Sequence, residues 1–202
     1  MSIDYTSFLT DERITRLKRT LDKRQTTLTV VLENIIDPHN LSACLRSCDA
    51  TGVSKVYLIY DGSQPFPKLK SSSSASASKW IEVEKYKSVK ECFEEIKKDG
   101  FKIYTTHMSA QSVPLYEIDF TSKIAIVFGN EHFGVSELAV NQADGNFLIP
   151  QVGMIQSLNI SVACAVSLYE AFRQRHEAGM YDSPQLTPDN YSTKLNKWAQ
   201  KK

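Results

Sequence analysis

The sequence predicts an α/β fold with a mainly parallel sheet and helices on both faces. Short apolar runs at residues 28–32 and 124–128 have the β-branched composition of buried strands. Segments with helical periodicity lie between and after these runs, at 10–25, 37–51, 88–99 and 160–178. Because strands alternate with helices along the chain, successive strands are expected to run parallel.

The first half of the chain begins with a predicted helix at 10–25, in which Ile14, Leu17 and Leu21 recur at helical spacing. After the strand at 28–32, Asp37 and Pro38 open a helix that Gly52 ends. The next strand is expected at 56–60. Residues 61–78 form a loop rich in Ser, Lys and Pro, which is either a linker or a loop that contacts substrate.

The second half continues the alternation. Residues 80–83 alternate as an edge strand does, and 88–99 form a solvated outer helix. Strands are expected at 101–105, 124–128 and 147–149, followed by the long helix at 160–178 and a weak helix at 193–200. We therefore divide the chain into a basic helical extension at 1–27, a main domain at 28–179 and a C-terminal tail at 180–202.

Charge is nearly balanced overall, with a formal net charge of +1, but both ends are locally basic. Residues 10–25 contain six basic and three acidic side chains, and residues 171–202 contain the same numbers. Such ends either grip a phosphate backbone or form solvated helix faces, and charge alone favours the second reading.

The cysteines and the apolar runs indicate the cellular compartment in which the protein is expected. The four cysteines lie within apolar patterns, which favours buried thiols over a zinc site. No apolar run approaches the ~18 residues of a membrane span, and the first residues do not resemble a signal peptide. We expect a cytoplasmic protein without a metal or a membrane partner.

Three polar loops follow predicted strands directly, at 37–40, 128–134 and 149–159. None contains the glycine pattern of a dinucleotide site, a P-loop or a hydrolase nucleophile elbow. Once these motifs are excluded, the loops offer backbone groups, side-chain amides and one Glu, together with Arg46 on the helix after the first loop. Such groups suit the binding of a small neutral or cationic molecule and a phosphate. The residues alone thus indicate only an α/β protein that binds a nucleotide-like ligand.

These loops carry a family resemblance. The runs LENIIDPHNLSACLRSCDATGV (32–53), IVFGNEHFGVS (126–136) and IPQVGMIQSLNISVACAVSLYEAFRQR (149–175) resemble the three motifs of the TrmH family of SPOUT methyltransferases, in order and in spacing. The flanking sequences resemble its tRNA guanosine 2′-O-methyltransferase branch, and the resemblance covers about residues 17–181. It implies a C-terminal trefoil knot at about 124–171 and a homodimer with its site at the subunit interface.

The resemblance implies methyl transfer from S-adenosylmethionine to the ribose 2′-hydroxyl of a tRNA guanosine, at position 18 in the D-loop. The alternatives are 2′-O-methylation of ribosomal RNA, the wobble-base branch of the family, and a non-catalytic RNA-binding protein with the same fold. About 27 residues precede the first strand, which favours tRNA, because ribosomal members often carry a separate N-terminal domain.

By the same resemblance Arg46 is the central catalytic residue. Since a guanidinium is a poor base, we expect it to hold an RNA phosphate and lower the pKa of the hydroxyl, with a base role as the alternative. Without the motif, Arg46 would be expected to pair with Asp49 on an exposed helix face. The other expected catalytic residues are Asn40, Glu131, Ser157 and Asn159.

Three of these residues have structural alternatives. Asn40 positions Arg46 or the ribose, or else caps its helix, and Asn159 supports the site or caps the long helix. Glu131 balances the sulfonium charge or fixes its loop.

Backbone groups expected to bind the cofactor belong to Thr106, Gly129, Ile149 and Leu158. Side chains expected to bind tRNA are those of Arg16, Lys18, Arg19, Arg24, His39, Arg173 and Arg175.

Overall fold

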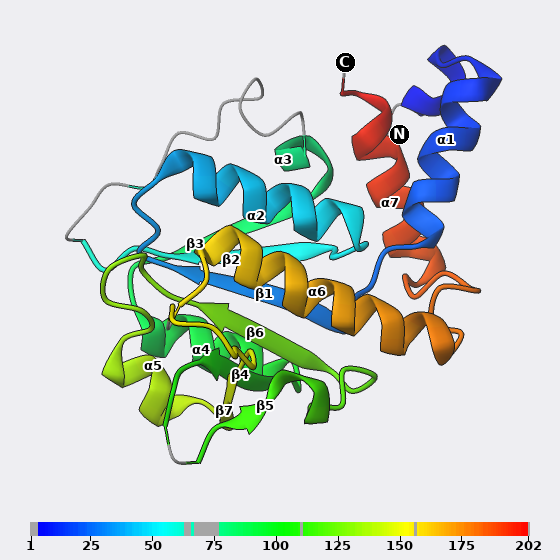
Figure 1. Ribbon diagram of the computed structural model, residues 1–202. Coiled ribbons are helices and arrows are strands. Elements are labelled where there is room, and N and C mark those ends of the chain that lie inside the picture. The colour runs from blue at the N-terminus through cyan, green and yellow to red at the C-terminus, as the bar shows by residue number, and fades with distance from the viewer. Residues whose placement is uncertain (1–3, 63–65, 67–76, 110, 156, 202) are drawn as a thin grey trace.

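The computed structural model describes residues 4–62, 66, 77–109, 111–155 and 157–201. A seven-stranded sheet in the order β3-β2-β1-β6-β4-β7-β5 lies at its centre, and all of its strand pairs are parallel (Figure 1). The strands are β1 Leu28–Glu33, β2 Lys55–Ile59, β3 Glu82–Tyr86, β4 Lys102–Thr106, β5 Val113–Pro114, β6 Ile124–Phe128 and β7 Gly145–Leu148. The predicted fold class is confirmed.

The two strongest apolar runs of the sequence form adjacent strands in the middle of this sheet. β1 and β6 pair in register from Leu28 with Ile124 to Leu32 with Phe128. Every residue of both strands is buried. A strand covered by helices on both faces requires apolar side chains at successive positions, which explains the unbroken runs in the sequence.

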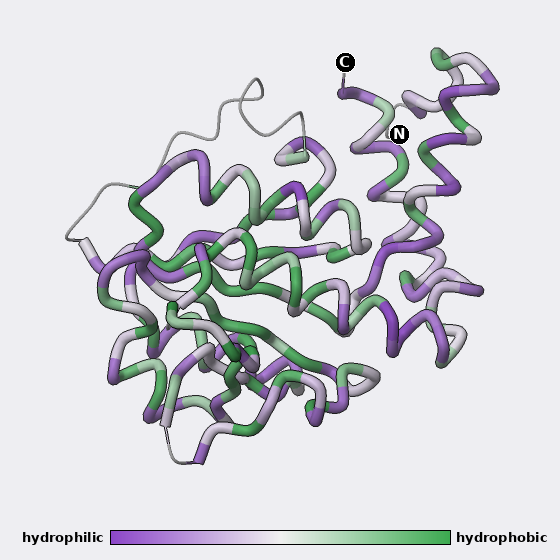
Figure 2. Tube along the Cα trace, in the orientation of Figure 1, coloured by the Kyte–Doolittle hydropathy of each residue, from purple (hydrophilic) through white to green (hydrophobic). Residues whose placement is uncertain are grey.

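Helices cover the two faces of the sheet, as predicted. α2 (Pro38–Ala50) and α6 (Ile160–Glu177) pack on one face, where Leu45 and Leu168 join Val30 in one core. α4 (Val89–Lys98) and α5 (Glu137–Gln142) pack on the other, where Phe93 joins Val31. Val30 and Val31 face opposite ways because side chains alternate along a strand. Figure 2 shows apolar residues concentrated in the strands and in the helix sides that face them.

A third, smaller core joins the two ends of the chain. α1 (Asp11–Asp22) and α7 (Pro188–Ala199) lie side by side, with the short helix η1 (Tyr5–Phe8) against α7 (Figure 1). Leu17 and Leu21 of α1 are buried against Leu195 and Trp198 of α7. The predicted extension and tail therefore form one helical unit, and Trp198 of this unit meets Trp80 of the main domain edge to face at 5.4 Å.

Some predicted bounds are wrong. The strand expected at 80–83 begins at Glu82, because residues up to Trp80 form the short helix α3 (Ala77–Trp80). The weak helix expected at 193–200 begins at Pro188, whose fixed φ suits the first helical turn, and the Thr187 hydroxyl caps it. α5, β5 and the short helix η2 (Leu115–Glu117) were not predicted. Most of the Ser-rich loop at 61–78 lies outside the described residues.

All four cysteines are buried free thiols, as predicted. None of the helices in the described part of the chain is long and apolar enough to cross a membrane.

One buried cation ties the C-terminal half of α6 to the sheet. Arg175 is inaccessible to solvent, and each of its five N–H groups donates a hydrogen bond of 2.8–3.0 Å. The acceptors lie just before β1, at Gln25 and Thr27, and just before β6, at Phe120 and Ser122. Burial lowers the pKa of Arg175 to about 10, so the side chain stays charged at neutral pH. The guanidinium thereby fixes the starts of the two central strands against α6.

We expect Arg175→Met to reduce the free energy of unfolding by about 3 kcal/mol or more, because it leaves several buried acceptors without a donor. Urea titration monitored by circular dichroism measures this loss. Arg173→Met is the matched control on the same helix. Arg173 is exposed and pairs with Glu170 and Glu177, so its loss is expected to change the free energy of unfolding much less than the loss of Arg175. Equal losses for the two variants would contradict the anchoring role.

Candidate functional site

A cavity of about 880 Å³ lies at the carboxyl edge of the sheet, where β4, β6 and β7 end. This is the edge at which parallel α/β sheets bind ligands. All four residues expected to bind a cofactor through their backbone line it, and so do Glu131, Ser157 and Asn159. The second and third motifs of the sequence therefore meet in one place. Phe128, Phe147, His107 and His132 also line the cavity, although they were not among the site residues expected from the sequence.

The loop after β6 is tightly folded and needs a glycine at its first position. A Cβ on Gly129 would lie 2.1 Å from the Gly134 carbonyl carbon, far inside contact distance. Asn130 and Gly134 exchange two backbone hydrogen bonds of 2.8 Å, which close the loop. The Asn130 side chain donates to the Asn34 carbonyl at 2.8 Å and accepts from the backbone of His132. The loop is thus fixed against the end of β1, and sequence reasoning missed this role of Asn130.

The Glu131 carboxylate joins this loop to the start of α2. It accepts hydrogen bonds from the backbone N–H groups of Ile36 at 3.0 Å and Asp37 at 3.1 Å, and from the Asn40 amide at 3.1 Å. Burial alone would raise the pKa of Glu131, but these hydrogen bonds outweigh it and lower the pKa below its ordinary value of 4.5. Glu131 is therefore ionised at neutral pH, and both of its oxygens are engaged.

Asn40 extends the connection to the third loop. Its carbonyl oxygen accepts from the Asn159 amide at 3.1 Å, and the Asn159 oxygen accepts from the backbone of Ser161 at 2.8 Å. Asn159 therefore caps α6, as its structural alternative predicts, and it also donates a hydrogen bond to Asn40. Asn40 is not a helix cap, because Asp37 caps α2 through His39. We call Glu131, Asn40 and Asn159 the polar chain, since they connect all three motif loops.

Arg46 lies apart from this cavity within one chain. It is exposed on α2, and among the described residues it makes no hydrogen bond or ion pair. The alternative in which it pairs with Asp49 is wrong, because Asp49 pairs with Arg24 instead. The Arg46 guanidinium is thus free to bind a group that is not part of its own chain.

Two of the expected RNA-binding arginines are buried, so those assignments are wrong. Arg24 is 1% exposed, pairs with Asp49, donates to the Val53 carbonyl at 3.0 Å and stacks over Trp198. Arg175 is the buried anchor of α6. Its position follows from the apolar stripe of Cys164, Leu168 and Ala171, whose spacing continues onto residue 175. A charge count ignores this periodicity.

The remaining candidates for RNA contact are at the surface. Arg16, Lys18 and Arg19 are exposed on α1, and His39 is exposed at the start of α2. Arg173 is exposed as well, but Glu170 and Glu177 bind it at 2.8 and 2.7 Å. These two carboxylates neutralise its charge, which weakens the case for a phosphate contact by Arg173. In the described part of the chain no group of His, Cys, Asp and Glu is arranged to hold a metal ion.

Comparison with known proteins gives a consistent set of similarities. The model of the SpoU rRNA Methylase family matches residues 27–169. The chain is 43% identical over 192 residues to the tRNA (guanosine(18)-2'-O)-methyltransferase of Thermus thermophilus, which covers 95% of this chain and 98% of that protein. It is 40% identical over 169 residues to the Escherichia coli K12 protein of the same name, which covers 84% of this chain and 73% of the other.

Solved structures are similar over the same region. The A. aeolicus TrmH/SpoU tRNA modifying enzyme superposes with a TM-score of 0.88 at 40% identity, over 94% of this chain and 95% of that one. The AdoMet-bound rRNA methyltransferase from Sinorhizobium meliloti superposes with a TM-score of 0.67 at 27% identity, over 77% of this chain and 59% of the other.

The polar chain predicts a pH-dependent stability. We expect Glu131→Gln to destabilise the protein by about 2 kcal/mol at pH 7, because the amide replaces one acceptor oxygen with a donor that faces other donors. The pKa of Glu131 is lower in the folded state, so its contribution is fully present above pH 4.5 and is lost as pH falls through the folded pKa. Urea unfolding at pH 7 and below pH 4 measures the difference.

Glu117→Gln is the control for this measurement, since Glu117 is exposed and faces no such donors in the described structure. We expect it to change the free energy of unfolding little at either pH. A difference between wild type and Glu131→Gln that did not shrink on acidification would contradict the assigned hydrogen bonds.

Proposed function

The chain belongs to the SpoU rRNA methylase family, and we propose that it transfers a methyl group from S-adenosylmethionine to the ribose 2′-hydroxyl of guanosine 18 in the tRNA D-loop. The observation that carries this proposal is the similarity to tRNA (guanosine(18)-2'-O)-methyltransferases along nearly the whole chain. The cavity at the carboxyl edge supports the proposal, since residues of the second and third motifs line it.

The donor set of the cavity suits this cofactor. Phe128, Phe147 and Ile149 supply apolar walls, backbone groups of Thr106, Gly129 and Leu158 supply polar contacts, and Glu131 supplies a negative charge. A carboxylate complements a sulfonium cation, and we propose that Glu131 both fixes its loop and balances that charge. S-adenosylmethionine, when bound, supplies an electrophilic methyl group whose transfer needs alignment with the attacking oxygen.

Arg46 and the polar chain supply the remaining functions in this proposal. Arg46 binds the RNA phosphate beside the ribose, which positions the hydroxyl and stabilises the oxyanion that forms as the hydroxyl proton passes to water. Asn40, held by Glu131 at 3.1 Å, and Asn159 orient the ribose. Ser157 lines the cavity and supports the same contact. Arg46 carries this role better than a base role, since a guanidinium stays protonated.

We infer that two copies of the chain build each complete site. Arg46 does not line the cavity of its own chain, so a second copy is the natural source of this side chain. The exposed apolar residues near the site support an interface: Val162 and Tyr169 lie two turns apart on α6, and Met154 and Ile155 precede it. The trefoil knot at about 124–171 is part of the same proposal, since the loops at 128–134 and 147–160 converge on one cavity.

We place the enzyme in the cytoplasm, which the free buried cysteines and the activity of the relatives on tRNA support. Ribosomal RNA is the weaker alternative as a substrate. The chain is 37% identical to a 23S rRNA methyltransferase from Xanthomonas axonopodis but spans only 59% of that protein. A non-catalytic role is disfavoured because the polar chain and the exposed Arg46 are both present.

We expect Arg46→Ala to reduce single-turnover methyl transfer to tRNA by at least about 100-fold, the range found when a transition-state donor is removed. Its affinity for S-adenosylmethionine is expected to stay within a few-fold of wild type, because Arg46 does not line the cavity. Quenched-flow transfer of a labelled methyl group and calorimetric titration of the cofactor measure the two quantities.

Mixing experiments provide the control for the two-copy site. Leu158→Trp fills the cavity from a lining position and is expected to abolish cofactor binding. Neither this variant nor Arg46→Ala is active alone, but their mixture is expected to regain activity, since a mixed dimer contains one complete site. Near-wild-type turnover by Arg46→Ala would contradict its catalytic role, and a mixture as inactive as its components would contradict the shared site.

A further inference from the structure

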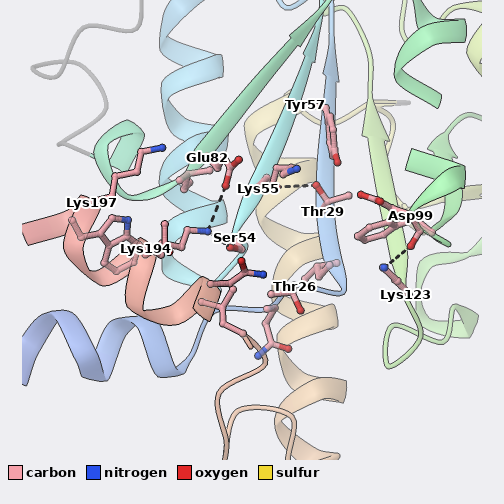
Figure 3. A pocket seen from close by; sticks show the side chains of 18 of the residues that line it. Thr26, Thr29, Ser54, Lys55, Tyr57, Glu82, Asp99, Lys123, Lys194 and Lys197 are labelled. Carbon is pink, nitrogen blue, oxygen red and sulfur yellow. Dashed lines mark hydrogen bonds and ion pairs between the residues drawn. The ribbon is translucent and has the colours of Figure 1, made fainter. Parts of the chain in front are cut away.

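A second cavity, of about 540 Å³, lies at the opposite edge of the sheet from the candidate site. It is bounded by the amino ends of β1, β2 and β3, by the residues just before β4 and β6, and by α7 (Figure 3). We call it the amino-edge pocket. The proposed methyl transfer uses none of its residues.

The charged side chains of this pocket are mostly cations. Five lysines line it, at positions 55, 123, 194, 197 and 201, against the carboxylates of Glu82 and Asp99. In Figure 3, Lys194 and Lys197 extend from α7, Lys55 comes from β2, and Lys123 lies on the opposite side beside Asp99. A chain with a net charge of +1 thus concentrates positive charge at one concave place.

Only part of this charge is neutralised. Lys55 pairs with Glu84 at 2.6 Å, and Lys194 lies 3.7 Å from Glu82. Lys123 and Lys201 donate to backbone carbonyls, which carry no net charge. Among the described residues Lys197 makes no hydrogen bond or ion pair. Among the described residues, three lysines of the lining (Lys123, Lys197 and Lys201) therefore make no ion pair, and the Asp99 carboxylate near Lys123 offsets only part of their charge.

The electrostatics of the lysines agree with this geometry. Burial is the main cause of a lowered pKa at Lys194 and at Lys201, and the neighbouring lysine at 197 lowers both further. Like charges that repel across a pocket are stabilised when an anion binds between them. The pocket is thus poised for a negatively charged ligand.

The aromatic side chains of the pocket narrow the chemistry of that ligand. Tyr57 and Trp198 are 1% and 2% exposed, so their ring faces are not available for a base to stack on. Asn190 and Thr193, both exposed on α7, add neutral side-chain donors to the lining. Ammonium groups together with amide and hydroxyl donors recognise phosphate oxygens and do not read a base.

We propose that the amino-edge pocket binds phosphate groups, either of an RNA backbone or of a free phosphate compound of nucleotide size. The RNA case rests on the proposed function, which brings tRNA to this chain. The volume suits a small ligand or a short backbone segment, since ligand pockets span roughly 300–1,000 Å³. α7 then has a binding role besides its packing on α1.

The test compares the double variant Lys123→Gln, Lys197→Gln with the matched double variant Lys90→Gln, Lys98→Gln. The control removes the same charge from α4, where each lysine faces an exposed carboxylate at 3.9 or 3.8 Å. Affinity for an unmodified tRNA transcript is measured at several salt concentrations. Affinity for inorganic pyrophosphate is measured by calorimetry in a phosphate-free buffer.

If the pocket binds RNA, the log–log salt slope of tRNA binding decreases by roughly 0.7–0.9 for each lost phosphate contact, about 1.5 in all. If it binds a free phosphate compound, pyrophosphate affinity falls at least about 10-fold while the tRNA slope stays that of the control. Either result supports the proposal. Values indistinguishable from the control in both measurements would overturn it.

Two further measurements keep the outcome decisive. Lys197→Gln alone repeats the comparison at an exposed side chain that has no partner among the described residues, so it carries the test if the double variant does not fold. Wild-type methyl transfer is assayed in parallel. If the wild type methylates tRNA but the lysine variants bind tRNA and pyrophosphate as the control does, the pocket proposal is rejected and the proposed function stands. If the wild type transfers no methyl group but binds pyrophosphate in a way that depends on Lys197, only the proposed function is rejected.

Discussion

The Glu131 carboxylate holds the candidate site together, because it is the point at which the loop after β6 meets the start of α2. An ionised carboxylate accepts several hydrogen bonds at once, and here it takes two backbone N–H groups and the Asn40 amide. Asn40 can then use its oxygen to accept from Asn159, which caps α6. One half-buried carboxylate thus joins the first two motif loops, which lie some ninety residues apart in sequence, and Asn40 extends the connection to the third loop.

The parallel sheet gives its two edges different chemistry. Backbone groups, apolar walls and the polar chain gather at the carboxyl edge, where we propose that the cofactor and the ribose bind. The amino edge instead carries the buried Arg175 and the lysines of the amino-edge pocket. Arg175 is fully hydrogen-bonded and therefore structural, whereas Lys197 has no partner in the described part of the chain. The distinction between an anchoring and a binding cation depends on these contacts and not on charge.

The sequence predicted those features that depend on local periodicity and failed where distant contacts decide. β6 was predicted with its bounds because five successive apolar residues have few other stable places in an α/β fold. Arg24 was expected to bind RNA, yet its partners Asp49 and Val53 lie 25 and 29 residues away, so a charge count could not reveal its burial. The family resemblance brought Glu131 and Asn40 into the site but did not show that they bind each other. The start of α7 was predicted five residues too late, because Pro188 resembles a helix breaker until its place in the first turn is known.

The central claim is that this chain methylates one ribose of tRNA, and the position of the methyl group tests it most directly. An unmodified tRNA transcript is incubated with the protein and isotopically labelled S-adenosylmethionine, and the labelled nucleotides are identified by nuclease digestion and mass spectrometry. We predict label on the ribose 2′-oxygen of guanosine 18 and at no other nucleotide. Label on a base, label at another position, or cofactor binding without any transfer to tRNA would contradict the claim.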